Sequence, residues 1–503
     1  MRRIFFILIF LLALTVRLFK IDTIPSEWYG DISNVHEYVT QILKGDWPFY
    51  FFQSPGPFYH YLIVPIVWLF QGHGYETYKG ASIIISILGL VATYLFIREI
   101  SSRTLALITT LVASLSLWFV IWSRLGNSQI VIPVLVSFLS YFLVRYLKRG
   151  KFWDIFFTCL VASLGWYTYP QTFLFPVAFL VYLVFFLVIT KKLKSSRWHL
   201  FSTILFLFIF ALPFINIVKR QPDNFGSKGY VGEKVLPVIS MEKGELIKKI
   251  INNIKKTALM LHVKGDISFR VNVSSHPQID WISGLLFFAG IAYFFFLKRR
   301  IWLSLILWML VVLPLASISP AIPEVEIPNS ARTIAIVPFV FLLVGGGILL
   351  VYKGLRGLKI SAPLASFVVS CVFAYSVLIN IRLYFTTYAY GLPDRNLGPG
   401  RIIGQAVDKL GREVGVYFSS CCWGEWGEPE PKGVAYVLRV KREINYHKLI
   451  EGCNEIDHYP ALIIANPYTE NELEKFRKCS SQYKTSSIIT EGGQLISRFI
   501  LLE

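Results

Sequence analysis

The residues best suited to chemistry lie in one polar stretch, residues 24–61, with the sequence IPSEWYGDISNVHEYVTQILKGDWPFYFFQSPGPFYHY. Counting back to Asp22, this part of the chain holds five acidic residues, and its second half is rich in aromatic residues. A carboxylate under aromatic cover is desolvated, which raises its basicity and lets it accept a proton from a hydroxyl or an amine. Asp31, which follows a glycine, is the main candidate for such a base. His36 and Glu37 are secondary candidates for the same role or for a metal ligand.

Asp31 also fits a structural role. Asp31 or Ser33 could cap a helix that begins near Asn34, and Glu37 would then lie in the first turn, where the helix dipole favours an acid. The two roles are compatible in one residue, so the sequence leaves both open.

A second set of candidates consists of cations at the ends of apolar runs or in the polar loops between them. A single arginine in such a place commonly extends towards a lipid headgroup. Several that converge beside an acidic loop could instead bind a phosphate bidentately as negative charge develops on it. Such a group would fit the departure of a lipid phosphate. Its candidate members are Lys79, Arg124, Arg270 and Arg332.

Composition indicates the class of protein. Of the 503 residues 54% are hydrophobic and only 16% are charged, which is typical of a polytopic membrane protein. The formal charge of +19 could suggest a nucleic-acid partner. However, the lysines and arginines occur in short clusters between apolar runs instead of on one soluble face, and this pattern argues against nucleic acid.

Eleven apolar runs have about the 20-residue length that a spanning helix needs. The first has no small-x-small cleavage site after it and is expected to be an uncleaved span. A glycine run, 345–347, falls inside the tenth and is interpreted as a site of close helix packing. The eleven runs are 4–19, 79–97, 104–122, 129–147, 152–169, 173–190, 199–218, 280–297, 301–318, 332–352 and 361–380.

The basic residues orient these spans, because short cytoplasmic loops retain lysine and arginine. If residues 57–70 do not cross the membrane, every basic cluster falls on the side of the N-terminus. We therefore expect 57–70 to form a juxtamembrane or re-entrant helix and the N-terminus to be cytoplasmic. The outer side then carries loops 20–78 and 219–279 and everything after about 381. The clusters are Arg98/Arg103, Lys148/Arg149/Lys151, Lys191/Lys192/Lys194/Arg197, Lys298/Arg299/Arg300 and Lys353/Arg356/Lys359.

Residues 381–503 are polar and interrupted by glycine and proline, and they predict a small α/β domain outside the membrane, separate from a membrane domain over 1–380. The pattern favours strands at 412–418, 433–440 and 461–465 and a helix at 469–478. Four cysteines in this part could form disulfides, with a pairing that the sequence does not fix. They are Cys421, Cys422, Cys453 and Cys479.

The order of several segments resembles a known family. After the aspartate of the first outer loop and a proline-rich aromatic segment come WSRLGNSQIVIP (122–133), YTYPQTFLFP (167–176), GDISFRVNVSSHPQIDW (265–281) and NSARTIAIVPFVFLLVGGG (329–347). Together they resemble the integral-membrane glycosyltransferases of the dolichyl-phosphate-mannose protein mannosyltransferase type, and prokaryotic relatives similar to the aminoarabinose-lipid A transferase. The resemblance covers about residues 1–380.

This resemblance implies a GT-C fold, an α-helical polytopic architecture of about eleven transmembrane helices plus juxtamembrane helices, with an outer cavity. It also implies a polyprenyl-phosphate sugar as donor and Asp31 as the position of the catalytic base. Many family members have Asp-Glu there, whereas this chain has Asp31-Ile32, so a second acid is absent or displaced to Glu37. A Gly-Asp…Arg-x-Asn…Pro pattern of a bacterial subset is matched by Asp266, Arg270, Asn272 and Pro277.

The sequence thus predicts a glycosyltransferase of a prokaryotic plasma membrane that transfers a sugar from a polyprenyl-phosphate carrier to an unidentified acceptor on the outer face. Tyr59, His60 and Tyr169 are expected to line the groove for donor or acceptor. The scheme needs no cofactor, and a divalent metal is possible although no ligand set stands out. Two alternatives remain open, a flippase or transporter for lipid-linked sugars and a GT-C relative without activity.

Overall fold

The computed structural model describes residues 2–28, 31–49, 56–70, 74–226, 228–229, 231–296, 300–420, 433–434, 449–466, 470–489, 493 and 495–503. The chain forms two compact units. The first consists of Met1–Phe19, Tyr38–Leu69 and Tyr78–Tyr388, and the second of Lys20–Glu37, Phe70–Thr77 and Ala389–Glu503. The second unit therefore combines the C-terminal part of the chain with two pieces of the loop that follows the first helix.

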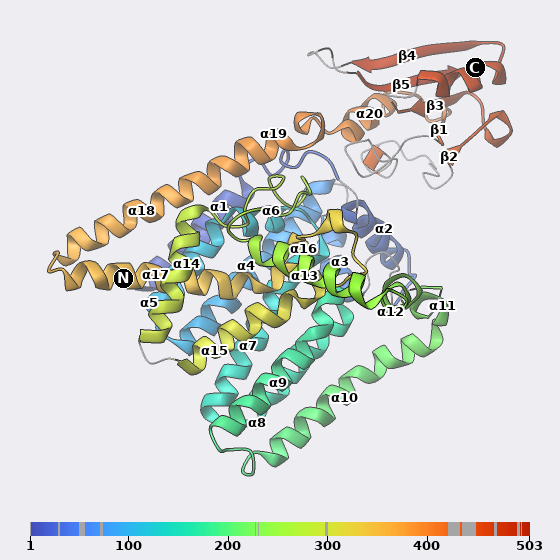
Figure 1. Ribbon diagram of the computed structural model, residues 1–503. Coiled ribbons are helices and arrows are strands. Elements are labelled where there is room, and N and C mark those ends of the chain that lie inside the picture. Colours follow the sequence, from blue (N-terminus) through green and yellow to red (C-terminus); the bar gives the residue numbers. More distant parts are fainter. Residues whose placement is uncertain are drawn as a thin grey trace. The chain divides into compact units, whose positions relative to one another are not determined.

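The first unit is a bundle of helices (Figure 1). Helices α2 and α4 each begin in residues of the second unit and continue into this one. The helices up to α9 are α1 (Arg2–Leu18), α2 (Asp31–Leu43), α3 (Phe58–Leu69), α4 (Tyr75–Ile100), α5 (Arg103–Leu115), α6 (Leu117–Arg124), α7 (Val131–Arg149), α8 (Phe152–Ser163) and α9 (Leu174–Ile189). Those that follow are α10 (Arg197–Arg220), α11 (Pro222–Phe225), α12 (Leu236–Ile239), α13 (Lys243–Leu259), α14 (Trp281–Phe296), α15 (Arg300–Val312), α16 (Ser330–Thr333), α17 (Val337–Gly357) and α18 (Ala362–Leu383).

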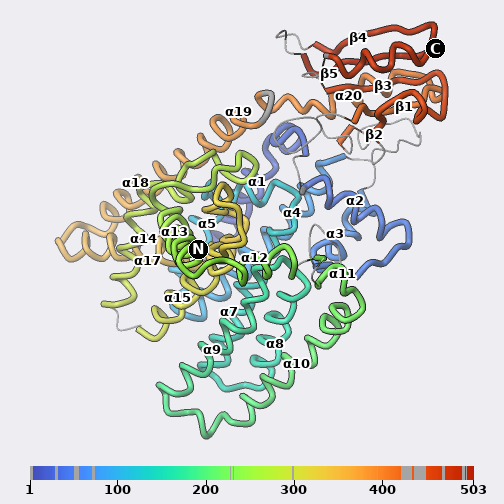
Figure 2. Tube along the Cα trace, turned by 45° about the vertical axis from the view of Figure 1, so that its right-hand side comes forward, coloured from blue at the N-terminus to red at the C-terminus, as the bar shows by residue number. Residues whose placement is uncertain are grey.

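Each of the eleven predicted spans coincides with helix, so the predicted class of polytopic helical membrane protein is confirmed. Within the described residues, seven helical segments are long and apolar enough to cross a membrane. The run at 104–122 differs from the prediction of one straight helix, because α5 and α6 meet at a bend of 63°. The remaining runs form the shorter apolar helices α1, α8 and α14. Helices α8, α9 and α10 lie side by side in both views (Figures 1 and 2).

Helix α3 corresponds to the segment 57–70 that was expected not to cross. It has twelve residues and contains Pro65, so it is about 18 Å long, against about 30 Å for a hydrocarbon core. Gly56 precedes it with a φ of 109°, and a Cβ atom there would lie 2.0 Å from the carbonyl oxygen of Thr168. Only glycine allows this approach, and it brings the proline-rich aromatic segment against the YTYPQTFLFP segment.

Helix α17 packs between α5 and α14 through small residues. A Cβ atom on Gly290 would lie 1.8 Å from the carbonyl oxygen of Leu343, and one on Gly347 would lie 2.0 Å from that of Leu286. On the other side, a Cβ atom on Gly345 would meet the side chain of Thr109 at 2.3 Å. The glycine run therefore serves close helix packing, as the sequence predicted.

The bend between α5 and α6 leaves backbone groups without helical partners, and side chains from other helices satisfy them. The carbonyl of Ser114 accepts a hydrogen bond of 2.9 Å from Arg17 Nη1. The amide of Leu117 donates one of 2.8 Å to Asn380 Oδ1. Asn380 in turn donates to Asp280, whose carboxylate also accepts from the backbone amides of Ile282 and Ser283 at the start of α14.

The second unit is a five-stranded sheet with helices on both faces. The sheet order is β2-β1-β3-β5-β4, in which β1 pairs in parallel with β2 and β3, and β5 pairs antiparallel with β3 and β4. Leu462 and Ile464 of β3 pack in the same core as Ile403 of α20, and Ile463 packs on the opposite face with Phe476. The elements are α19 (Ala389–Gly391), α20 (Pro399–Val407), β1 (Gly415–Ser419), β2 (Leu449–Ile450), β3 (Ala461–Ala465), a 3₁₀ helix (Glu470–Cys479), β4 (Tyr483–Ile489) and β5 (Leu495–Leu502).

The predicted α/β character of the C-terminal part is confirmed, with strands where 412–418 and 461–465 were expected and a helix after the second. The predicted strand 433–440 lies outside the described residues except for Gly433 and Val434, which are helical. Strands β2, β4 and β5 were missed. β4 is exposed along nearly its whole length and β2 has two residues, so neither shows the apolar alternation that identifies a half-buried strand.

Cys453 and Cys479 form a disulfide that closes a sequence separation of 26 residues. It connects the region before β3 with the end of the 3₁₀ helix. Cys421 and Cys422 lie outside the described residues. The disulfide rigidifies one face of the sheet, where Cys479 packs against the buried core.

We expect replacement of Cys453 and Cys479 by serine to lower the free energy of unfolding of the second unit by about 3 kcal/mol, because the unfolded chain regains the entropy of the closed loop. Pulse proteolysis of the purified protein over a urea series measures this change. The matched control is Cys371→Ser, which removes an exposed free thiol of α18. Equal urea midpoints for the double variant and the control would contradict the role of the disulfide.

Candidate active site

Helix α2 places the acidic stretch of the first loop. It begins at Asp31, three residues before the predicted start near Asn34, so Ser33 lies inside the helix. The sequence Asp-Ile-Ser-Asn offers several residues able to begin or cap a helix, and more than one start is therefore compatible with it. The side chain of Asp31 lies outside the described part of the structure.

Trp28, His36 and Glu37 of this loop lie in the second unit. Trp28 stacks on Tyr75 with 5.1 Å between ring centroids, and His36 meets the edge of Trp28 at 5.2 Å. Glu37 lies one residue further along α2 and is half-buried. Across the residues described, no three His, Cys, Asp or Glu side chains come close enough to hold a metal ion.

Glu27 is a buried carboxylate that the sequence analysis did not single out. It is 4% exposed and accepts hydrogen bonds from the backbone amides of Trp28 and Gly400, at 3.0 and 2.6 Å. Gly400 lies in the first turn of α20, where a negative charge is stabilised by the helix dipole. Arg401 adds bonds to the carbonyl of Asp22 and to the carboxylate of Glu76. The acids of the first loop therefore hold the second unit together, a pairing across the sequence that no local pattern reveals.

The predicted groove residues of α3 are buried among rings. His60 is fully buried, with Tyr38 of α2 at 5.2 Å and Tyr59 at 5.8 Å between ring centroids. The Tyr59 hydroxyl lies 3.3 Å from Ser82 Oγ of α4, the helix that also carries the fully buried Lys79. Tyr169 is half-buried, and its carbonyl accepts from the hydroxyl of Thr172. The role of Tyr59, His60 and Tyr169 in a groove stays a prediction.

Arg124 and Arg17 connect the end of α1 to the bent helix pair. Arg124 Nη1 donates to the carbonyls of Val16 and Phe19, at 2.8 and 2.7 Å, and so satisfies carbonyls that the end of α1 leaves open. Arg17 donates in the opposite direction, to Ser114 at the bend. The two guanidinium groups are both fully buried and lie close enough for their charges to interact.

A row of aromatic and polar contacts continues from Arg124 to Arg270. The Arg124 guanidinium lies 5.0 Å from the ring centroid of Tyr384, and Tyr384 stacks on Tyr388 at 5.2 Å. The Tyr388 hydroxyl donates a 2.7 Å hydrogen bond to the carbonyl of Arg270. The row therefore connects Arg124 to Arg270. The charges of Arg270 and Arg332 both act on the carboxylate of Asp266. Three of the four predicted cations are connected in this way.

Asp266 is the centre of that connection. Its two carboxylate oxygens accept from the backbone amides of Ser268 (2.8 Å) and Ser330 (2.6 Å), the latter at the start of α16. Burial raises the pKa of Asp266 to about 6, although these two amides and the charges of Arg270 and Arg332 favour the ionised form. Asp266 thus joins the loop 265–281 to the segment NSARTIAIVP.

The loop around Asp266 is held by Asn272, whose side-chain amide donates to the carbonyls of Asp266 and His276, at 3.0 and 2.7 Å. From the other side, Trp122 Nε1 of α6 donates a 2.9 Å hydrogen bond to Ser330 Oγ. The predicted substrate residues Asp266 and Asn272 are therefore brought together. Asn272 binds carbonyls of its own loop, whereas the Asp266 carboxylate binds one amide of its own loop and the amide of Ser330. Trp122 and Ser330 were not predicted, although each lies in a segment that carried the resemblance.

Arg332 has one hydrogen-bond donor, Nη1, that is not used within the described residues. Its Nη2 bonds to Glu326 Oε2 at 3.0 Å, and its backbone amide is capped by Asn329. Nη1 is buried and, within the described residues, has no hydrogen-bond partner. The side chain is 20% exposed. A buried guanidinium edge without a partner costs free energy unless an anion or water completes it.

Comparisons with known proteins agree with this architecture. The sequence model of the family described as dolichyl-phosphate-mannose-protein mannosyltransferase matches residues 54–215. A comparison with curated protein sequences gives no match. Among solved structures, the chain superposes over nearly its full length on membrane proteins of one fold, and that fold is GT-C.

The similar structures are these. ArnT from Cupriavidus metallidurans, bound to undecaprenyl phosphate, matches with a TM-score of 0.58 and 12% identity over 98% of this chain and 97% of that one. The apo oligosaccharyltransferase of Archaeoglobus fulgidus matches with a TM-score of 0.53 and 13% identity over 97% of this chain and 69% of that one. AglB of the same organism, in complex with an inhibitory peptide and a dolichol-phosphate, matches with a TM-score of 0.53 and 11% identity over 98% of this chain and 74% of that one. The resemblance to GT-C glycosyltransferases seen in the sequence is thus supported by the fold.

The ionisation of Asp266 predicts a pH-dependent stability. Because its pKa is raised in the folded state, the folded protein binds the proton more tightly than the unfolded chain between about pH 4 and pH 6. The contribution of Asp266 to the free energy of unfolding is therefore greatest below about pH 4 and falls as the pH rises to 6. Melting of wild type and Asp266→Asn in detergent from pH 4 to 7 should show a difference between them that shrinks over that window and is constant above it.

Glu324→Gln serves as the control for this titration. Glu324 is an exposed carboxyl whose pKa is lowered by its hydrogen bond to Lys256. Its removal can cost stability at every higher pH, but the pH dependence of that cost must lie below the ordinary pKa of the carboxyl, so the difference from wild type should stay constant as the pH rises from there to 6. A difference between wild type and Asp266→Asn that does not vary from pH 4 to 6 would contradict the raised pKa.

Proposed function

We propose that this protein is a membrane glycosyltransferase that moves a sugar from a polyprenyl-phosphate carrier to an acceptor on the outer face of a prokaryotic plasma membrane. The observation that carries the proposal is the end-to-end similarity to the GT-C structure of ArnT bound to undecaprenyl phosphate. The family match over residues 54–215 supports the same class of reaction. The sugar and the acceptor are left open by this proposal.

In the proposed reaction, the Asp31 carboxylate accepts the proton of the acceptor's hydroxyl or amine. The acceptor then attacks the anomeric carbon as the bond from that carbon to the phosphate oxygen breaks, and polyprenyl phosphate leaves. Inversion at the anomeric carbon follows from attack opposite the leaving group. Negative charge increases on the departing phosphate, so guanidinium donors that gain strength with that charge lower the barrier.

Arg332 is the best supported candidate to bind that phosphate, because its Nη1 is buried without a partner in the described part of the chain. Glu326 fixes the other edge of the guanidinium. Arg270 is assigned to the same role through its place beside Asp266. Lys79 and Arg124 remain candidates, with Arg124 already giving two hydrogen bonds to the end of α1.

The proposed location has two supports. The disulfide between Cys453 and Cys479 is typical of an oxidising compartment. The basic clusters favour a cytoplasmic N-terminus and an outer C-terminal domain.

A flippase or transporter is the rival with an observation in its favour, since the bent pair α5–α6 is the kind of interrupted helix that transporters use at substrate sites. In this chain, however, the carbonyl of Ser114 and the amide of Leu117 at the bend are bonded to Arg17 and Asn380. Those backbone groups are therefore not directed at a substrate.

The base assignment is tested with Asp31→Asn in liposomes, using a panel of radiolabelled polyprenyl-phosphate sugars, membrane extract as acceptor, and release of free polyprenyl phosphate as readout. Loss of a general base should slow release by roughly 10²–10⁴-fold. Asp46→Asn, an exposed acid of the same loop, is the matched control and should release at the wild-type rate. Wild-type release in Asp31→Asn would overturn the base assignment. Release from no donor by folded wild-type protein would favour the flippase or the inactive relative.

For the phosphate site, we expect Arg332→Gln to weaken binding of undecaprenyl phosphate by roughly 10- to 100-fold, the usual range for a lost charge-assisted hydrogen bond in a buried site. Binding is measured by native mass spectrometry. Arg220→Gln, which removes an exposed arginine at the end of α10, is the control of equal charge. The role of Arg332 is excluded if both variants bind as wild type does.

A further inference from the structure

Helix α13 exposes a row of isoleucines. Ile247, Ile251 and Ile254 are 57%, 60% and 47% exposed, and side chains at this spacing lie on one side of a helix. Asn253 and Thr257, on another side of α13, are buried. The row of three isoleucines is therefore left largely uncovered by the described part of the chain.

Helix α13 does not have the composition of a spanning helix. Its 17 residues include five lysines and one glutamate, whereas a span needs about 20 mostly apolar residues. A helix that combines an apolar side with lysines on its other sides is typical of one that lies along the membrane surface, with the apolar side in hydrocarbon.

The end of α13 lies at the level where another helix enters the membrane. The amide of Gln278 donates a 3.0 Å hydrogen bond to the carbonyl of Met260, the residue that directly follows α13. The apolar helix α14 begins three residues after Gln278, at Trp281, whose ring is 64% exposed. Exposed tryptophans at the end of an apolar helix are typical of the boundary between hydrocarbon and water.

The middle of α13 is bonded to the end of a second apolar segment. Asn253 Nδ2 donates to the carbonyls of Ile318 and Ser319, at 3.2 and 3.3 Å. These carbonyls directly follow Arg300–Ser317, one of the segments long and apolar enough to cross a membrane. Because α14 begins and this segment ends beside α13, both contacts belong to one side of the membrane, and α13 lies along that side.

Two lysines border the isoleucine row. Lys248 and Lys255 are exposed, and each directly follows an isoleucine of the row, so they lie about 100° from it around the helix. Neither forms an ion pair within the described residues. In contrast, Lys249 and Lys256 are paired with glutamates, at 2.9 and 2.8 Å. Long lysine side chains beside an apolar stripe extend to the level of the lipid headgroups.

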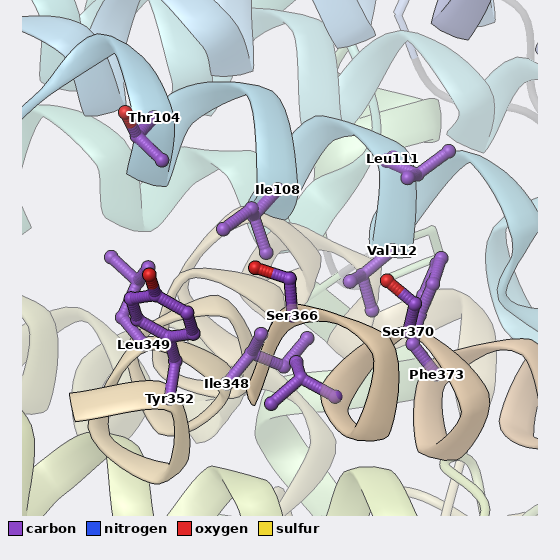
Figure 3. Close-up of a pocket in the computed structure, with 11 residues that line it drawn as sticks. Thr104, Ile108, Leu111, Val112, Ile348, Leu349, Tyr352, Ser366, Ser370 and Phe373 are labelled. Atoms are coloured by element: carbon purple, nitrogen blue, oxygen red, sulfur yellow. The ribbon is translucent and has the colours of Figure 1, made fainter. Parts of the chain in front are cut away.

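This surface differs from the apolar groove between α5, α17 and α18 that Figure 3 shows. The groove has a volume of about 390 Å³ and is lined by apolar side chains and by hydroxyl groups such as those of Ser366 and Ser370. None of the described residues that line it is charged. The groove therefore offers no charge that could select a lipid headgroup, whereas α13 carries its charges beside its apolar row.

We propose that α13 lies in the headgroup region of the leaflet in which α14 begins, with the isoleucine row in hydrocarbon and Lys248 and Lys255 bound to phosphates of anionic phospholipids. A lysine close to the membrane surface is attracted by a net negative lipid charge. Through Asn253, the contact also holds the chain after Ser317 at the level of the headgroups. The binding does not depend on the proposed transfer reaction.

Quenching of a bimane label on α13 by spin-labelled lipids in liposomes tests the contact with hydrocarbon. The label is attached at Ile251→Cys in the Cys371→Ser background, which removes an exposed free thiol, and the signal of the background protein is subtracted. Phosphatidylcholine with a nitroxide near the top of its acyl chain should quench this label. The matched label at Glu245→Cys, about 120° away around the helix, should be quenched several-fold less.

The label at Ile251→Cys also measures lipid selectivity. Nitroxide-labelled phosphatidylglycerol and phosphatidylcholine are compared at equal mole fraction, and the ratio of quenching gives their relative affinity for the site. We expect the preference for the glycerol lipid to fall roughly fivefold for each charge removed in Lys248→Gln and Lys255→Gln. Lys248→Arg with Lys255→Arg should retain it. Lys409→Gln with Lys478→Gln, which removes two exposed charges of the second unit, is the control of equal charge and should leave it unchanged.

Three results would overturn the proposal. Equal quenching at the two label positions would show that the isoleucine row is not in hydrocarbon, which is the result expected if a protein partner or a second copy covers it. Equal quenching by the two lipids would show that the lysines select no headgroup. An equal loss of preference in the α13 variants and in the control of equal charge would make the attraction one of net charge. Melting of each variant in detergent separates a lost lipid contact from a lost fold.

Discussion

The membrane imposes one condition on this chain that the rest of the structure has to meet, namely that no backbone amide or carbonyl can be left unpaired in hydrocarbon. The bend between α5 and α6 creates such groups, and Arg17 and Asn380 satisfy them from other helices. Arg124 does the same for the carbonyls at the end of α1. The buried cations Arg17 and Arg124 therefore support helix ends, and the carbonyls that accept their hydrogen bonds solvate their charge in the interior.

This condition also shapes the candidate site. The bent pair ends in α6, where Trp122 bonds to Ser330, and Ser330 bonds to the Asp266 carboxylate. Because the backbone at the bend is held in place, the loop 265–281 and the start of α16, which are bonded to α6, are held in place as well. Arg332, two residues further on, has a guanidinium nitrogen, Nη1, that no group of the described residues binds. A rigid frame with one incomplete donor is the arrangement expected of a site that binds an anion in a defined orientation.

The acids of the first loop divide into different roles although they are close in sequence. Glu27 is committed to the amides of Trp28 and Gly400 within the second unit. Asp31 begins α2, and His36 contacts the ring of Trp28.

The sequence by itself determined the class of protein, the positions of the eleven apolar runs that are helical, and the α/β character of the C-terminal part. These follow from the length of the apolar runs and the period of the apolar residues along the chain. A membrane sets narrow limits on the length of a spanning helix. It also identified the segments that converge around Asp266, through their resemblance to a family. Only the tertiary structure decided the bend at Ser116, the pairing of Cys453 with Cys479 and the role of Glu27. Each of these depends on partners far away in the sequence, and a local pattern contains no information about which distant group will satisfy a buried charge or a free backbone amide.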